Sequence, residues 1–149
     1  MQAKAHVLKI PGKCLCGKVG FDVELPTIWC AHCHCSRCRL AHGSAFVTWF
    51  GVRQTQFQIV SGNEEIQWYH SSEEAKRGFC GNCGSTMFFH STRWPDEMHI
   101  ALSYVIGQID RLPQAHVFYD KHVDWYTTND KLKRFGGLSG TEPIEEQSP

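Results

Sequence analysis

The chain of 149 residues is long enough for one domain with a modest hydrophobic core, and 42% of its residues are hydrophobic. Its 15 basic side chains (Lys and Arg) balance its 15 acidic ones. This balance gives no general attraction to phosphate backbones or anionic lipid, so it argues against nucleic-acid partners and against membrane-surface binding.

No stretch of the chain has the length of apolar residues that spans a bilayer, and the opening residues contain no apolar run typical of a signal peptide. We therefore expect a soluble, cytoplasmic protein. A reducing compartment keeps the eight cysteines free, and their close spacings suit a metal ion, with zinc as the default. Disulfides stay an alternative for a processed or hyperthermophilic protein.

Short segments rich in β-branched and aromatic residues predict a mainly β protein. Residues 18–25 alternate Val19, Phe21, Val23 and Leu25 with polar residues, which is typical of a half-buried strand. Further strands are expected at residues 44–50, 57–60, 65–70, 86–90, 98–102 and 115–120, with turn-forming residues between them. The helical pattern is weak, with one or two turns expected at residues 35–43 and one at residues 71–77.

The chain shows neither a repeat nor an internal boundary, so we expect a single zinc-binding domain over residues 1–135. After Phe135 the sequence changes to "GGLSGTEPIEEQSP", which offers little to bury. Residues 136–149 are therefore expected to form a flexible C-terminal tail.

Two pairs of cysteines have the spacing of metal-ligand pairs: Cys14 with Cys16, and Cys80 with Cys83. Neighbouring glycines permit the tight turns that such pairs need, and two pairs supply the four ligands of a tetrahedral zinc site. The pairs lie far apart in the sequence, so a shared ion would tie distant segments together and have a structural role. The alternative is that these are ordinary buried thiols.

A second cluster, Cys33, Cys35 and Cys38, has a spacing that can place three thiolates around one zinc ion and leave its fourth position free. Cys30 also has a ligand spacing relative to Cys33 and would close the site. In an extended strand, however, Cys30 points to the face opposite Cys33 and Cys35, and we favour a buried bystander thiol. A bend at this point would make Cys30 a fourth ligand, and this alternative stays open.

Four segments carry a resemblance to a known family. "KCLCGKVGFDV", "CHCSRCRLAHGSAF", "KRGFCGNCGSTMFF" and "HVFYDKHVDW" resemble, in this order, the glutathione-dependent formaldehyde-activating enzyme (GFA) family, whose domain also occurs in centromere protein V. The resemblance implies an Mss4-like fold, a β-tent of antiparallel sheets stapled by two zinc ions. By position it implies that Cys33, Cys35 and Cys38 hold a catalytic zinc. It also implies a structural zinc whose ligands are Cys14, Cys16, Cys80 and Cys83.

The resemblance also implies an activity, that of a carbon-sulfur lyase-type enzyme. Such an enzyme condenses a small thiol, glutathione, with formaldehyde or another small aldehyde to S-hydroxymethylglutathione. An open three-thiolate zinc site suits this chemistry, because zinc has no redox chemistry and can activate a thiol or polarise an aldehyde oxygen. No glutathione-binding motif matches residue by residue. The alternatives are a non-catalytic zinc-stapled binding module and a glutathione carrier.

Charged residues near the second cluster have less specific patterns. Three thiolates around a divalent ion leave negative charge, which Arg37, Arg39 and Arg77 are candidates to offset, although surface positions are as common for arginine. His32 and His34 share the strand face opposite the cysteines, so we expect them in an outer shell or on the surface rather than as ligands.

The remaining ring residues are expected to have structural roles. Four histidines without a metal spacing are interpreted as residues of strand faces: His90, His99, His116 and His122. Most aromatic residues are expected in the core, with Phe46 and Trp125 as candidates for the lining of a substrate cleft.

Overall fold

The computed structural model describes residues 7–144, and by its contacts the chain divides into two compact units. The first unit comprises residues 1–28 and 50–111, and the second comprises residues 29–49 and 112–149. Within the described part of the chain, no helix is long and apolar enough to cross a membrane. The single domain over residues 1–135 stays a prediction.

The first unit is built almost entirely of strands: β1 (Lys9–Lys13), β2 (Gly20–Glu24), β5 (Phe57–Ser61), β6 (Ile66–His70), β7 (Ala75–Cys80), β8 (Thr86–Ser91) and β9 (Glu97–Ala101). The first unit also contains three short 3₁₀ turns: η1 (Gln54–Gln56), η2 (Asn63–Glu65) and η3 (Leu102–Tyr104). The second unit contains β3 (Trp29–Cys33), α1 (Ser36–His42), β10 (Ala115–Val117), η4 (Tyr119–Lys121), β11 (Lys133–Gly136) and β12 (Glu142–Pro143). The boundary between the units falls within β4 (Val47–Arg53).

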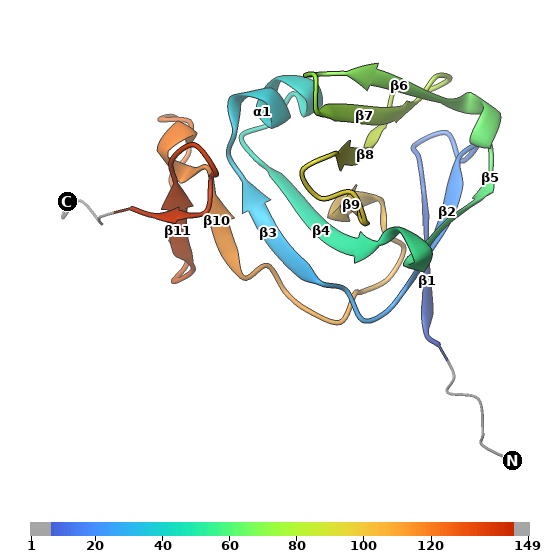
Figure 1. The fold of residues 1–149 in the computed structure, drawn as a ribbon, viewed down its shortest axis with the longest axis horizontal. Helices are drawn as coiled ribbons and strands as arrows, with labels where there is room; N and C mark the ends of the chain where they lie inside the picture. Colours follow the sequence, from blue (N-terminus) through green and yellow to red (C-terminus); the bar gives the residue numbers. More distant parts are fainter. Residues whose placement is uncertain (1–6, 145–149) are drawn as a thin grey trace, which may run out of the picture. The chain divides into compact units, whose positions relative to one another are not determined.

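The strands of the first unit form two antiparallel groups, in the orders β1-β2-β5 and β9-β8-β7-β6 (Figure 1). An aromatic cluster joins the two groups. Phe88 of β8 lies with its ring centroid 5.4 Å from that of Phe21 on β2 and 5.1 Å from that of Phe57 on β5. Phe21 and Phe88 are fully buried, so these rings are the centre of the hydrophobic core of this unit.

Gly12 on β1 allows the core side chain Phe21 to lie close to this strand. A Cβ atom at position 12 would lie 2.1 Å from the tip of the Phe21 ring, a distance that no side chain allows. The glycine therefore fixes the packing of β1 against β2 two residues before Cys14.

In the second unit, β10 lies between β3 and β11 and pairs with both in parallel, while β11 and β12 are antiparallel. Helix α1 begins after Cys35, whose sulfur accepts a hydrogen bond from the Cys38 N–H. It ends at Gly43, which has φ +61° and donates its N–H to the Arg39 carbonyl. The helix therefore lies within the segment 35–43, where the sequence predicts one or two helical turns.

The mainly β architecture confirms the expected fold class, with local differences. The turn expected at residues 71–77 runs into β7, which hydrogen-bonds to both β6 and β8. The strand expected at residues 115–120 ends at Val117, because Phe118 has φ +52° and leads into η4. The parallel pairs of β10 differ from the antiparallel sheets that the family resemblance implies.

The segment expected to be a flexible tail from residue 136 is paired over part of its length. Gly136 ends β11, and residues 142–143 pair with that strand as β12. The Gly137 N–H also donates to the Asp120 carboxylate, at 3.2 Å. These backbone contacts order a segment that has few apolar residues. Composition alone does not reveal such contacts. Residues 145–149 of the expected tail lie outside the described residues.

Candidate functional site

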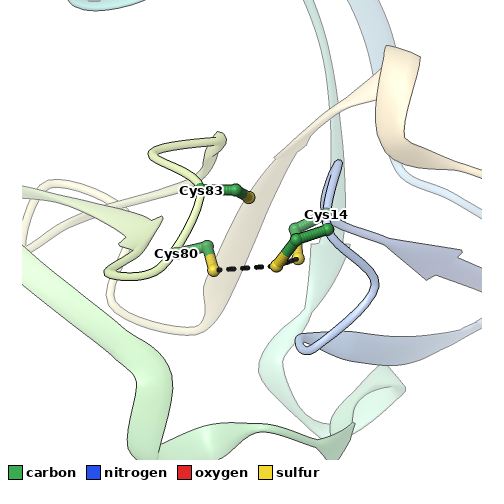
Figure 2. A group of neighbouring side chains, drawn as sticks. Cys14, Cys80 and Cys83 are labelled. Carbon is green, nitrogen blue, oxygen red and sulfur yellow. Dashed lines mark hydrogen bonds between the residues drawn. The ribbon is translucent and has the colours of Figure 1, made fainter.

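The first cysteine cluster lies in the first unit, where two turns meet. Cys14 and Cys16 follow β1, and Cys80 and Cys83 lie at and just after the end of β7. The four sulfur atoms lie within 4.8 Å of one another, and Figure 2 shows the side chains of Cys14, Cys80 and Cys83 converging. The sulfur of Cys16 is 3.6 Å from that of Cys14 and 3.8 Å from that of Cys80.

These separations fit a metal centre and exclude disulfides. The sulfur atoms of a disulfide are about 2 Å apart, whereas the edge of a zinc tetrahedron with bonds of about 2.3 Å measures about 3.8 Å. Both expected pairs therefore contribute to one group of four donors that fits a closed tetrahedral site.

Backbone and hydroxyl groups around the first cluster stabilise thiolates. The Val19 N–H donates to the Cys14 sulfur at 3.3 Å, and the Ser85 hydroxyl lies 3.3 Å from the Cys83 sulfur. The hydrogen bond with Ser85 lowers the pKa of Cys83 to about 5, whereas burial raises the pKa of Cys80 to about 11. A cation bound beside them would favour the thiolate form of both Cys80 and Cys83. The two thiols are therefore suited to bind a metal, although their pKa values differ.

The second cluster brings together Cys33, Cys35 and Cys38, at the end of β3 and the start of α1 in the second unit. Their sulfur atoms lie within 4.8 Å of one another, and those of Cys33 and Cys38 are 3.7 Å apart. Hydrogen bonds with Cys35 and Cys38, followed by burial, raise the pKa of Cys33 well above its ordinary value. Three crowded sulfurs ionise together only beside a positive charge, so this donor set also fits a cation.

Cys30 does not join this cluster. Its side chain is completely buried on β3, and among the described residues the group of mutually close donors contains Cys33, Cys35 and Cys38 without it. The backbone of Cys30 bonds to Gln114, which donates its N–H to the Cys30 carbonyl at 2.8 Å. This arrangement supports the interpretation of Cys30 as a bystander and of the cluster as a set of three donors.

A chain of three hydrogen-bonded side chains begins between Cys33 and Cys35 of the second cluster. His34 Nε2 lies 2.8 Å from His116 Nδ1, and His116 Nε2 lies 2.9 and 3.0 Å from the two carboxylate oxygens of Asp130. When His116 is neutral, the carboxylate accepts from its Nε2–H, and its Nδ1 accepts from His34 Nε2–H. His34 Nδ1 is then a bare acceptor, and it is buried without a hydrogen-bond partner in the described structure.

The electrostatics of this chain keep His34 neutral. Burial, followed by the positive charges of His116 and other neighbours, lowers the pKa of His34 to about 4. Burial acts to raise the pKa of Asp130, but hydrogen bonds, first that from His116, outweigh it and hold the pKa below its ordinary value. The chain therefore joins a neutral His34 to the Asp130 carboxylate through His116.

The other sequence candidates are spread over both units. Arg39 Nε donates to the His34 carbonyl at 3.3 Å, Arg37 is exposed, and Arg77 is buried in the first unit with its guanidinium 5.0 Å from the centroid of the Phe89 ring. Phe46 contacts the rings of His32 and His34, whereas Trp125 is 70% exposed.

Two expectations about histidines need correction or refinement. His34 is buried and hydrogen-bonded, so its surface alternative is wrong. His116 lies on a strand, as expected, but it is fully buried and hydrogen-bonded at both ring nitrogens. Asp130 was not identified as a candidate from the sequence, because the polar residues around it indicate only a turn.

Comparisons with known proteins place these cysteines in a wider context. A family model described as glutathione-dependent formaldehyde-activating enzyme matches residues 9–121, a span that contains all seven cysteines of the two clusters. The chain belongs to this family. Asp130 and the residues after it lie outside the matched span, so they are not part of what the GFA family model describes.

Two relatives of this GFA protein cover most of its length. An "uncharacterized lyase" of Schizosaccharomyces pombe is 33% identical over 83% of this chain and 88% of its own. A protein of Halomonas elongata named "putative glutathione-dependent formaldehyde-activating enzyme" is 27% identical over 78% of each chain. A crystal structure of a Rhodobacter sphaeroides protein superposes with a TM-score of 0.58 at 27% identity, covering 67% of this chain and 91% of the other.

Proposed function

We propose that this protein is a zinc-dependent carbon-sulfur lyase-type enzyme that condenses glutathione with formaldehyde, or with another small aldehyde, to S-hydroxymethylglutathione. The observation that carries the proposal is the set of three converging cysteines, Cys33, Cys35 and Cys38, in a chain of the GFA family. The names of the two relatives, one a lyase and one a glutathione-dependent formaldehyde-activating enzyme, support the reaction class.

The donor sets fit two zinc ions per chain, one held by four cysteines and one by three. Bound to the three-cysteine set, zinc supplies a Lewis acid with one open coordination position. In the reaction, the sulfur of the thiol forms a bond with the aldehyde carbon, the carbon-oxygen double bond becomes single, and the thiol proton ends on the new hydroxyl. No electron is gained or lost, which suits a metal without redox chemistry.

Residues of the second unit keep this set of three in place. The Cys38 N–H donates to the Cys35 sulfur and ties the donor to the first turn of α1. Arg39 holds the carbonyl of His34, the residue between Cys33 and Cys35, at 3.3 Å. His34 stays neutral, so it adds no charge beside the cysteines.

Thiolate donors require reduced cysteines, which supports a cytoplasmic location. The balanced charge of the chain supports small molecules rather than nucleic acid as partners. A glutathione carrier is the second candidate, because the same site can bind the thiol without accelerating its addition to an aldehyde.

One experiment separates the enzyme from the carrier. The rate of S-hydroxymethylglutathione formation is followed with zinc-loaded protein, with Cys35→Ser, and with Cys30→Ala as a matched control in the same strand and loop. We expect acceleration that is abolished by Cys35→Ser and kept by Cys30→Ala. If calorimetry shows glutathione binding while the rate stays at its uncatalysed value, the protein is a carrier and the proposed enzyme is wrong.

A further inference from the structure

Tyr119 of η4 lies at the centre of a group of polar rings and a cation in the second unit. Its ring stacks on that of His122, with the centroids 4.2 Å apart, and contacts the His34 ring edge-on at 5.0 Å. The guanidinium of Arg134, on β11, lies 4.8 Å from the centroid of the same ring. Thr128 connects the two residues, since its hydroxyl is 3.2 Å from the Tyr119 hydroxyl and 3.3 Å from Arg134 Nη2.

Arg134 is held firmly, yet its charge has no anionic partner. Its Nη2 donates to the Thr128 carbonyl at 2.9 Å, and its buried Nε–H has no acceptor in the described structure. Among residues 7–144, no acidic side chain lies within ion-pair distance of this guanidinium. A half-buried guanidinium with a fixed orientation and unused donors is suited to receive a carboxylate.

His34 provides the second, independent feature on the same platform. It is 2% exposed, and its Nδ1, which is an acceptor when His116 is neutral, is buried without a hydrogen-bond partner in the described structure. An unpaired buried acceptor is costly, so a ligand N–H that reaches it gains a full hydrogen bond. The Tyr119 ring therefore contacts both a cation, Arg134, and the ring of His34, the residue that separates Cys33 from Cys35.

We propose that Arg134, supported by Tyr119, binds a carboxylate of the thiol substrate, and that His34 Nδ1 accepts a hydrogen bond from a neighbouring N–H of the same molecule. The ligand class is a small thiol that carries a carboxylate beside an amide, as the glycyl end of glutathione does. This inference rests on the proposed function, since it assigns the recognition of its thiol. Arg134 lies beyond the span that the family model matches.

The test compares a thiol with this end to one without it. Rates of addition to formaldehyde are measured with glutathione and with 2-mercaptoethanol, for the wild type, Arg134→Gln, Arg134→Lys and, as a matched loss of charge on the same strand, Lys133→Gln. Hydrogen bonds to a charged partner predict that Arg134→Gln raises KM for glutathione about tenfold to a hundredfold. Arg134→Lys should be intermediate, and Lys133→Gln should have little effect. None of the variants should change the rate with 2-mercaptoethanol.

Binding supplies a measurement that does not depend on turnover or on a variant that folds. Calorimetry with the wild type should show glutathione binding at least tenfold more tightly than its glycyl ethyl ester, and more weakly as salt rises. Equal affinity for glutathione and the ester, or equal losses with both thiols in Arg134→Gln, would overturn the assignment while leaving the proposed reaction intact. A wild type that accelerates neither addition would instead remove the proposed function, and this inference with it.

Discussion

Cys30 lies three positions before Cys33, the spacing of a metal-ligand pair, yet its completely buried side chain is not part of the group of three mutually close sulfurs. Strand geometry explains this, because residues 30 and 33 of an extended β3 point to opposite faces. We predict that Cys30→Ala keeps its full zinc content and costs about 1 kcal/mol of stability, the loss of a small buried side chain. Elemental analysis and urea unfolding measure both quantities. Loss of one zinc ion per chain would identify Cys30 as a ligand.

His34 gives the protein a predictable sensitivity to acid. Its pKa falls from an ordinary value of 6.5 to about 4 in the folded protein, so between these values the unfolded chain binds a proton that the folded protein does not. Stability should therefore decrease as pH falls from about 6.5 to about 4, by on the order of 2 to 3 kcal/mol from this residue.

Unfolding of the wild type and of His34→Gln across this pH range isolates the effect, because loss of metal in acid acts on both proteins. We expect the stability of the wild type to fall more steeply than that of the variant. Parallel curves would show that His34 is not held neutral by its surroundings.

Sequence could predict the cysteine clusters but not the histidine chain, and the reason is physical. Zinc ligands come from tight turns, so each cluster leaves close spacings in the sequence. The hydrogen bond between His34 and His116 joins residues 82 positions apart, and Asp130 reaches His116 from a segment with no regular pattern. Such partners meet only because β3 and β10 pair in register, with His116 opposite His32.

At the scale of the elements, the two clusters differ in what they hold together. Cys14 and Cys16 belong to the turn after β1, whereas Cys80 and Cys83 belong to the connection from β7 to β8. An ion bound there would tie together the two antiparallel groups of the first unit. Cys33, Cys35 and Cys38 span only the junction of β3 and α1, so they tie no distant segments.

We therefore predict unequal effects of removing one ligand from each cluster. A structural zinc site contributes about 10 to 16 kcal/mol of apparent binding free energy, as much as the whole stability of a small domain. Cys80→Ser should leave the protein unfolded or aggregated, while Cys35→Ser should stay folded and lose the chemistry. Thermal unfolding followed by circular dichroism measures the difference, and equal destabilisation by the two changes would count against it.

Alternating patterns were reliable where one face of a strand is buried. Val19, Phe21 and Val23 are fully buried as predicted, because their segment packs one face into the core. β7 was not predicted, because "AKRGFC" lacks the alternation of apolar and polar residues that marks a strand. Its position is set by hydrogen bonds to β6 and β8 on its two sides. The parallel pairing of β10 could not be predicted either, because the residues of a strand do not indicate which strands lie next to it.

At the scale of the whole molecule, the geometry divides seven cysteines into a group of four and a group of three, and all seven lie within the span that the family model matches. Each group lies within one of the two compact units. A closed set of four donors has no position for a substrate, and a set of three has one. The proposed function depends on this difference more than on any other feature of the fold.

Counting the metal ions on the intact chain tests that division most directly. Native mass spectrometry of protein purified without chelator resolves how many zinc ions each chain carries. We predict two ions in the wild type and in Cys30→Ala, and one in Cys35→Ser. A wild type that carries one ion at saturating zinc, or a Cys35→Ser protein that keeps two, would contradict the assignment of an open three-cysteine site.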